Sequence, residues 1–336
     1  MKIAINGFGR IGRTFFRAAT EARLEIVAIN DLADLPTLAH LAKHDTNYGE
    51  FPGEIETTDD GLMVNGRSIK FTSEADPAKL PWRELDVDLV IESTGVFTKK
   101  EKAQAHIEAG AKFVIITAPA KGDETVKTFV MGINEDSFDA TTDNVMSMAS
   151  CTTNALAPVA KVLSDKFGIE KAMMSTIHSY TMDQVLQDSP HKDLRRARGA
   201  ASSIIPTTTG ATKAVAEVLP ELAGKMDGVS FRVPTATVSL VDFVALLSKD
   251  TSVEEINNVL TKASDDPKFQ GALAVSDEPL VSVDYKGNSS GSIVDLLSTQ
   301  VIGGNLIKVV AWYDNEMGYS YRLTEFCRFL ESKTDK

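Results

Sequence analysis

The spacing of hydrophobic and polar residues divides the chain into two parts that meet near residue 150. Before that point, short apolar runs alternate with segments whose apolar residues recur at helical spacing. Alternation of this kind predicts a parallel sheet covered by helices on both faces. The predicted strands are 3–6, 26–30, 89–92, 113–117, 129–132 and 145–148, and the predicted helices are 10–21, 35–43 and 99–109. An Asn65-Gly66 pair predicts a β-hairpin over 62–71.

After residue 150 the pattern is different. The hydrophobic spacing over residues 152–167 predicts an amphipathic helix, and that over residues 171–180 predicts a strand. The basic segment 181–202 shows neither helical nor strand periodicity. The long alternating stretches that come later predict a mostly antiparallel sheet. Its expected strands are 230–235, 237–248, 280–284, 291–298 and 306–313, and a closing helix begins at residue 316. The chain is therefore expected to be α/β first and α+β afterwards.

Length and charge narrow the classes of function. A chain of 336 residues suits two domains. Its net charge of −12 argues against broad binding to nucleic acid or anionic membranes, which both reward positive charge. Two cysteines are too few for a disulfide framework or a Cys-rich zinc site, and we predict no metal. With no signal peptide and no apolar run of membrane-spanning length, the expected location is a reducing cytoplasm.

The turn after the first predicted strand has the pattern G-x-G-x-x-G, formed by Gly7, Gly9 and Gly12. Such glycines permit a tight turn, close approach of the backbone to a pyrophosphate, and close packing of helix on strand. Asp31 ends the second predicted strand, where a carboxylate binds the ribose hydroxyls of NAD and repels the 2′-phosphate of NADP. Alone, the motif is weak, and Asp31 could be a helix cap. Together they predict a Rossmann-type NAD site.

Cys151 stands at the start of the second part's first helix, among Ser, Thr and Asn neighbours. The start of a helix stabilises a thiolate, and backbone N–H groups there can hold an oxyanion. A lone cysteine is more often a small buried hydrophobe, and Cys327, between two phenylalanines, fits that description. Cys151 does not fit it, so we predict that Cys151 is a nucleophile.

A thiol nucleophile needs a base, and five histidines are available. His178 lies on the strand predicted directly after the helix of Cys151, and a returning strand brings the two near each other. His191 falls in the irregular basic segment. The other three lie on predicted helices of the first part and are interpreted as surface or satisfied residues: His40, His44 and His106. His178 is the preferred partner, although spacing alone leaves this open.

Hydroxyl and basic side chains collect in the second part of this acidic chain. A Thr-Gly pair at a helix start and planar guanidinium groups are both suited to phosphate. Any single arginine is more often a solvated surface charge, so the hypothesis depends on their occurring together. The residues are Thr181, Asp183, Arg195, Arg196, Thr207, Thr208, Thr209, Gly210 and Arg232.

Taken together, these segments resemble phosphorylating glyceraldehyde-3-phosphate dehydrogenases over essentially the whole chain. The matching segments are INGFGRIGR (5–13), ASCTTN (149–154), HSYT (178–181), HKDLRRAR (191–198), PTTTG (206–210) and WYDNEMGY (312–319). The resemblance implies oxidation of glyceraldehyde 3-phosphate with NAD and inorganic phosphate to 1,3-bisphosphoglycerate, in glycolysis or gluconeogenesis. It also implies a homotetramer with the segment 181–202 in its core. The implied domains are 1–150, completed by the helix 316–336, and 151–315.

The resemblance also implies a role for each site residue. Cys151 attacks the aldehyde to form a thiohemiacetal and then a thioester, and His178 is the base. The positions that receive the substrate's own phosphate are Thr181, Asp183, Arg196 and Arg232. Those around the attacking phosphate are Ser150, Thr152, Thr209, Gly210 and Arg232. The implied cofactor contacts beyond the glycines are Arg10, Ile11, Asp31, Thr94, Thr117 and Asn315, the last on the carboxamide side.

Three positions depart from the family pattern. Ala155 replaces a second cysteine that is common four residues after the nucleophile, so a disulfide at that spacing is impossible. Ala75 stands where a basic residue often flanks the adenine, and Ser189 is a change toward NADP-using members. Two alternatives remain: erythrose-4-phosphate dehydrogenase, which differs around the phosphate sites, and an NAD-binding interaction protein, against which the intact Cys151 and His178 argue.

Overall fold

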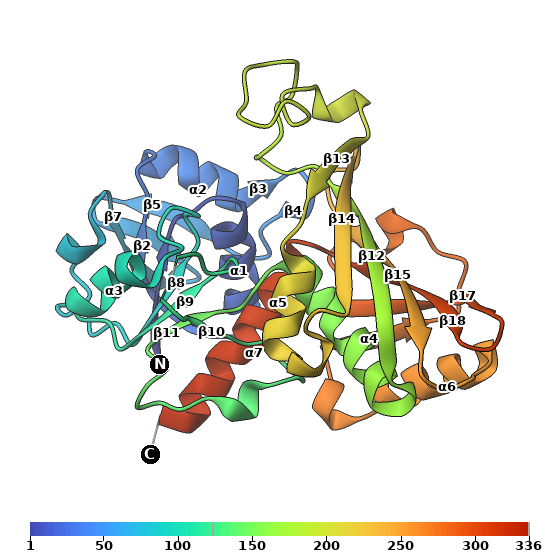
Figure 1. The fold of residues 1–336 in the computed structure, drawn as a ribbon. Helices are drawn as coiled ribbons and strands as arrows, with labels where there is room; N and C mark the ends of the chain where they lie inside the picture. The colour runs from blue at the N-terminus through green and yellow to red at the C-terminus, as the bar shows by residue number, and fades with distance from the viewer. Residues whose placement is uncertain (123, 335–336) are drawn as a thin grey trace. The chain divides into compact units, whose positions relative to one another are not determined.

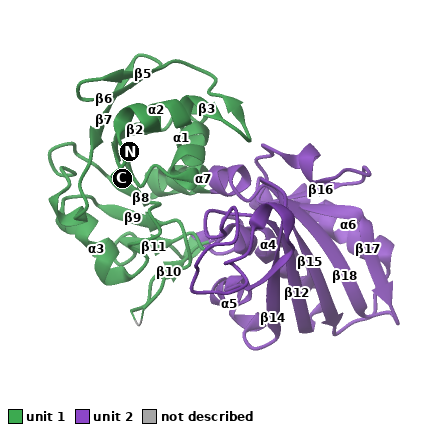
Figure 2. Cartoon of the chain, turned by 90° about the horizontal axis from the view of Figure 1, so that it is seen from above, with its two compact units in different colours: residues 1–129, 136–149, 323–336 green, residues 130–135, 150–322 purple. Residues whose placement is uncertain are grey.

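A computed structural model describes residues 1–122 and 124–334, which fold as two compact units. The first unit is Met1–Phe129 with Asp136–Ala149 and Leu323–Lys336, and the second is Val130–Glu135 with Ser150–Arg322 (Figure 2). Of the helix predicted over 316–336, residues 335 and 336 lie outside the described residues. Within the described ranges, no helix is both long enough and apolar enough to span a membrane.

The first unit is built on a nine-stranded sheet with the order β10-β11-β9-β8-β1-β2-β7-β6-β5 (Figure 1). Every pairing from β10 to β7 is parallel, and the two pairings at the β5 end are antiparallel. The strands are β1 (Lys2–Asn6), β2 (Glu25–Asn30), β5 (Ile55–Thr58), β6 (Gly61–Val64), β7 (Arg67–Thr72), β8 (Leu89–Glu92), β9 (Phe113–Ile116), β10 (Lys127–Thr128) and β11 (Val145–Ser147). A separate short pair is formed by β3 (His44–Asp45) and β4 (Gly49–Glu50).

The helices of this unit come from crossovers between parallel strands. Helix α1 (Arg10–Glu21) joins β1 to β2, α3 (Lys100–Glu108) joins β8 to β9, and α2 (Leu35–Lys43) follows β2. Since β2 and β9 lie on opposite sides of the β1–β8 pair, right-handed crossovers place α1 and α3 on opposite faces. The prediction of a parallel sheet covered on both faces is confirmed. The carboxyl ends of β1 and β8 form the topological switch point at which such sheets bind ligands.

The hairpin predicted around Asn65-Gly66 is also confirmed. It joins β6 to β7, with Val64 paired to Arg67. Both turn residues have positive φ, 48° at Asn65 and 77° at Gly66, as a type I′ turn requires.

Two predicted strands are wrong. Residues 129–132 are not a strand, because the short strand β10 ends at Thr128. Residues 280–284 overlap a 3-10 turn at Ser282–Tyr285, in which the Asp284 side chain accepts from the Val281 N–H at 2.8 Å. The alternation of Val281 and Val283 resembles a strand, but both side chains are exposed, so no sheet face buries them. The strand β16 (Leu273–Ser276) was not predicted.

The second unit contains a seven-stranded sheet with the order β13-β14-β12-β15-β18-β17-β16. The predicted mostly antiparallel character is confirmed, since only β12–β14 and β16–β17 pair in parallel. The strands are β12 (Ile169–Ser179), β13 (Ile205–Thr208), β14 (Met226–Val233), β15 (Ser239–Leu247), β16, β17 (Ser292–Ile302) and β18 (Leu306–Tyr313). Its helices are α4 (Cys151–Phe167), α5 (Ala211–Val218) and α6 (Val253–Ser264), and the last helix is α7 (Met317–Thr334).

Candidate active site and cofactor pocket

The glycine-rich turn after β1 requires residues that have no side chain. Gly7 has a φ of +90°, and a Cβ there would lie 2.6 Å from the Thr94 backbone nitrogen. A Cβ on Gly12 would lie 2.2 Å from the Gly7 carbonyl oxygen. The glycines therefore let the loop after β8 approach the turn and let α1 pack closely on β1.

The first turn of α1 follows directly, and its N-cap, Gly9, has no side chain to cap it. Asp31, at the end of β2, is held beside this turn. One carboxylate oxygen accepts from the Phe8 N–H at 2.6 Å, and the other accepts from the Ala33 N–H at 2.9 Å. A helix start with a fixed carboxylate beside it is the arrangement that binds pyrophosphate and ribose hydroxyls.

A cavity of about 340 Å³ opens at the carboxyl ends of β1, β2 and β8. Its lining includes four predicted cofactor residues, Gly7, Gly9, Asp31 and Thr94. The lining also includes residues that the sequence did not indicate as contacts: Asn6, Asn30, Leu32, Glu74, Ser93, Val96 and Phe97. Ala75, noted above only as a departure from the family pattern, lines the cavity as well. Leu32 and Val96 expose apolar surface, 68% and 60%, which suits the face of an aromatic base. The residues present therefore fit the adenosine half of NAD.

The other predicted cofactor residues lie outside the lining of this cavity. Arg10 forms an ion pair with Asp45, with Nη1 to Oδ2 at 2.6 Å. Thr117 donates its hydroxyl to the Glu92 carbonyl oxygen at 3.1 Å. Ile11 and Gly12 belong to the first turn of α1. Asn315 belongs to the second unit, where its Oδ1 accepts from the hydroxyls of Ser179 and Ser239 at 2.9 and 3.0 Å.

In the second unit, Cys151 is the first residue of α4. Ser150 is the N-cap, and its hydroxyl accepts from the Thr153 N–H at 3.1 Å. The Cys151 Sγ lies 3.5 Å from Nε2 of His178, near the end of β12. The structure therefore brings the predicted nucleophile and base within hydrogen-bonding distance. Cys327, by contrast, is buried in the first unit with 1% of its surface exposed.

Arg232 lies on the other side of the imidazole. Parallel pairing sets it beside His178 in the register of β12 and β14. Its Nη1 is 2.6 Å from His178 Nδ1 and 3.2 Å from the Ser179 carbonyl oxygen, which is itself 2.7 Å from Nδ1. A guanidinium N–H can only donate and a carbonyl oxygen can only accept, so Arg232 and Ser179 compete for Nδ1. When Nδ1 carries its hydrogen and donates to the carbonyl, Nε2 is the acceptor that faces the thiol.

Burial controls the protonation of the pair. It lowers the pKa of His178 to about 3, with the charge of Arg232 acting in the same direction. Burial also raises the pKa of the Cys151 thiol, while the charge of Arg232 and hydrogen bonds from Thr152 oppose this change. Burial outweighs these two effects, so the pKa of the thiol is not lowered at the helix start, where the sequence favoured a thiolate. A neutral imidazole faces a thiol, as general-base catalysis requires.

Tyr313 is a buried neighbour that sequence reasoning did not assign to the site. Its hydroxyl is 2.8 Å from the hydroxyls of both Thr152 and Thr176, and its ring packs edge-on against His178 with centroids 6.0 Å apart. The segment that contains Tyr313 resembles the family, but nothing in its residue types indicates contact with a histidine 135 positions earlier in the sequence.

The predicted phosphate-binding residues fall into two groups. Arg196 pairs with Asp183, and burial with the charge of Arg232 lowers the pKa of Arg196, so the two guanidinium groups act on each other. The buried Nε of Arg232 has no hydrogen-bond partner. Two mutually repelling arginines, one with an unmet donor, form a site suited to an anion.

The remaining predicted residues make local contacts. Thr181 donates its N–H to Gln184 Oε1 at 2.8 Å. Thr209 follows β13, the antiparallel neighbour of β14, and its hydroxyl accepts from the Ala211 N–H at 3.1 Å. Gly210 is the N-cap of α5 and offers no side-chain cap. None of these contacts joins Thr209 or Gly210 to Cys151 directly.

Comparisons with known proteins agree along the whole chain. Residues 1–100 match the family model "Glyceraldehyde 3-phosphate dehydrogenase, NAD binding domain", and residues 150–315 match the model of the C-terminal domain. A glyceraldehyde-3-phosphate dehydrogenase of Geobacillus stearothermophilus is 56% identical over 99% of both chains. Those of Priestia megaterium and Trichormus variabilis are 55% and 52% identical, also over 99% of both chains. This chain belongs to the glyceraldehyde-3-phosphate dehydrogenase family.

Proposed function

We propose that this protein oxidises D-glyceraldehyde 3-phosphate with NAD and phosphorylates the product to 1,3-bisphosphoglycerate, with Cys151 as nucleophile and His178 as base. The observation that carries the proposal is the 3.5 Å separation of Cys151 Sγ and His178 Nε2 at the start of α4. The family identifies the substrate class and the cofactor. No observation favours the tetrose-phosphate alternative.

The first step is attack by Cys151 on the aldehyde carbon. Nε2 of His178 accepts the thiol proton while the sulfur–carbon bond forms, and backbone N–H groups at the start of α4 face the developing oxyanion. His178 then returns this proton to the oxyanion, which gives a thiohemiacetal and leaves the imidazole free to act again as a base. Arg196 and Arg232 bind the phosphate of the aldehyde and orient its carbonyl toward the sulfur.

Oxidation then converts the thiohemiacetal into a thioester. His178 takes the proton of the thiohemiacetal hydroxyl as the C–H hydride leaves. Bound NAD supplies the hydride acceptor. The glycine turn, the first turn of α1, Asp31 and Thr94 would hold the cofactor, and the family resemblance assigns Asn315 to its carboxamide.

The last step transfers the acyl group to inorganic phosphate. A phosphate oxygen attacks the thioester carbon, the carbon–sulfur bond breaks, and Cys151 leaves as a thiolate. The thiolate recovers the proton that His178 took during oxidation, which restores the thiol and the neutral imidazole. Water competes for the same carbon, so selectivity requires a bound, oriented phosphate. Thr152, Thr209, the Gly210 N–H and Arg232 provide hydroxyl, amide and guanidinium donors for it.

We further propose that the enzyme is a cytoplasmic homotetramer. Both cysteines are free, and a thiol nucleophile needs a reducing compartment. The segment 181–202 extends past the ends of β12 and β14 (Figure 1). It also exposes large apolar side chains. Met182, Leu186 and Leu194 are 89%, 77% and 82% exposed. Apolar surface of this kind favours burial against further copies of the chain.

Brief treatment of the native enzyme with iodoacetamide should alkylate Cys151 and abolish activity. Cys327 should react only after unfolding, because its thiol is buried and its pKa is raised. Mass spectrometry of the labelled peptides distinguishes the two. The variant Cys327→Ser serves as control and should be inactivated at the rate of the wild type. Labelling of Cys327 with Cys151 spared would refute the assignment.

Arg232→Ala should raise the KM for both aldehyde and phosphate. Loss of one charge-assisted contact costs about 1.5–3 kcal/mol, or roughly ten- to a hundred-fold in binding. Rapid mixing should still show a burst of NADH followed by slow turnover, because Cys151 remains able to acylate. The exposed Arg67→Ala should behave as the wild type. A wild-type rate that is unchanged when phosphate is omitted would contradict the phosphorylating reaction.

Asp31→Ala should narrow the preference for NAD over NADP. The substitution removes a carboxylate that binds ribose hydroxyls and repels the 2′-phosphate. The measurement is the ratio of kcat/KM for the two cofactors in the wild type and the variant. A wild-type ratio that favours NADP would show that Ser189 affects cofactor preference more strongly than Asp31 does.

Leu194→Asp should shift the assembly toward smaller species, since it introduces a charge into the exposed apolar segment 181–202. Sedimentation velocity measures the change, and the wild type should sediment as four copies. Lys262→Asp on α6 is the control for an exposed charge reversal and should leave the assembly intact. A monomeric wild type at micromolar concentration would reject the tetramer.

A further inference from the structure

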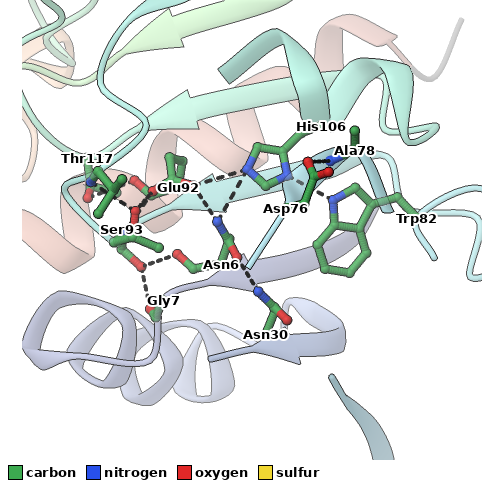
Figure 3. Close-up of polar contacts among 12 residues, drawn as sticks. Asn6, Gly7, Asn30, Asp76, Ala78, Trp82, Glu92, Ser93, His106 and Thr117 are labelled. Carbon is green, nitrogen blue, oxygen red and sulfur yellow. Dashed lines mark hydrogen bonds and ion pairs between the residues drawn. The ribbon is translucent and has the colours of Figure 1, made fainter. Parts of the chain in front are cut away.

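A buried polar cluster lies at the carboxyl ends of three adjacent strands of the first unit (Figure 3). The strands β1, β8 and β2 end in Asn6, Glu92 and Asn30, and parallel register pairs Asn6 with both of the others. Two positions earlier, the same strands carry alanine or valine in the apolar core. The three polar side chains are at most 4% exposed, so each must find its partners within the protein.

Glu92 is the centre of the cluster and accepts four hydrogen bonds. Its Oε2 accepts from Asn6 Nδ2 at 2.6 Å and lies 3.0 Å from His106 Nε2. Its Oε1 accepts from the backbone N–H of Thr94 at 2.9 Å and from the Thr94 hydroxyl. Both oxygens are therefore saturated by donors that converge from β1, α3 and the loop after β8.

His106 is fully buried on α3, and its tautomer follows from its hydrogen-bond partners. Its Nδ1 lies 3.0 Å from the indole Nε1 of Trp82. An indole N–H can only donate, so Nδ1 must be its acceptor, and the imidazole hydrogen is on Nε2, toward Glu92. His106, held at both nitrogens, thus connects Trp82 to Glu92.

One end of the cluster supports one wall of the cavity that we assign to the cofactor, the wall formed by the loop 93–97. Thr94, held by Glu92, lies against Gly7 and lines the cavity. The Thr94 hydroxyl also accepts from the Val96 N–H at 3.0 Å, and Val96 is another lining residue. The position of the loop 93–97 therefore depends on the Glu92 carboxylate.

The other end of the cluster supports a second wall of the cavity, formed by Glu74 and Ala75. Asn30 donates to Asn6 Oδ1 at 2.7 Å and to the Glu74 carbonyl oxygen at 2.9 Å. Its own Oδ1 accepts from the Glu74 N–H at 2.9 Å. Glu74 and Ala75 line the cavity. A continuous series of hydrogen bonds thus runs from Trp82 through His106, Glu92 and the two asparagines to Glu74.

We propose that Trp82, His106 and Glu92 are positioning residues for the adenosine half of the cofactor. Trp82 and His106 are absent from the lining of the cavity, and Glu92 acts on it through Thr94 and Asn6. Together they hold the two walls at the separation that admits an adenosine. The inference rests on the proposed function, because it takes this cavity as the cofactor pocket.

The test compares two substitutions of one residue. His106→Gln retains an amide N–H that can reach Glu92, whereas His106→Leu leaves Glu92 without that donor. We expect His106→Leu to raise the Kd for NAD and for ADP-ribose about tenfold, the lower end of what one hydrogen bond to a charged group contributes, and His106→Gln to stay within about twofold of the wild type. Isothermal titration calorimetry measures both ligands. In turnover, the effect should fall on the KM for NAD rather than on kcat.

Glu108→Gln, an exposed change on the same helix, is the matched control and should bind as the wild type. If His106→Leu does not fold, Trp82→Phe is the second variant. It removes the indole donor that sets the His106 tautomer, together with part of a buried ring, and it should raise both Kd values about fivefold. Variants that melt at lower temperature yet bind ADP-ribose as tightly as the wild type would overturn the proposal, as would equal effects of Gln and Leu at 106. A wild type that binds neither ligand would instead refute the cofactor pocket itself.

Discussion

Parallel strand pairing in register is the constraint on which both candidate sites depend. In a parallel sheet, neighbouring strands end at the same edge, and paired residues project from the same face. The β12–β14 pairing sets Arg232 beside His178 in the second unit, and the β1–β8 pairing sets Glu92 beside Asn6 in the first. Side chains more than 50 positions apart in the sequence are thereby brought into contact without a flexible loop, so their separations are set by the hydrogen bonds of the sheet.

The two clusters differ in how completely their polar atoms are satisfied. Around Glu92, both carboxylate oxygens and both ring nitrogens of His106 have partners. Around Cys151, the buried Nε of Arg232 has none, and His178 is kept neutral by burial. A saturated buried cluster is rigid and holds its surroundings in place, whereas unmet donors beside a thiol are available to a ligand. The saturated cluster around Glu92 is suited to holding neighbouring residues in position. The cluster around Cys151, which has an unmet donor, is suited to binding a substrate and reacting with it.

Sequence patterns predicted the regular elements well where local signals and tertiary packing agree. The strand at β1, the helix α1 and the Asn65-Gly66 turn all carry such signals, in apolar runs, helical spacing and turn residues. The failures have a common origin. Val281 and Val283 alternate like a strand but remain exposed, and residues 129–132 lie just beyond a strand of two residues. Apolar alternation cannot report whether a partner strand or a covering helix is present.

For the sites, the sequence determined the chemistry available: a glycine turn, a cysteine among polar residues at a helix start, histidines, and arginines in an acidic chain. Only the tertiary structure decided which of these groups meet. It set Cys151 3.5 Å from His178, with Tyr313 and Arg232 around the imidazole. It also gave His106, interpreted from sequence as a surface or satisfied residue, partners on both nitrogens in the interior. The physical reason is that residue type and spacing are local properties, whereas burial and hydrogen-bond partners depend on distant strands that pair only in the folded chain.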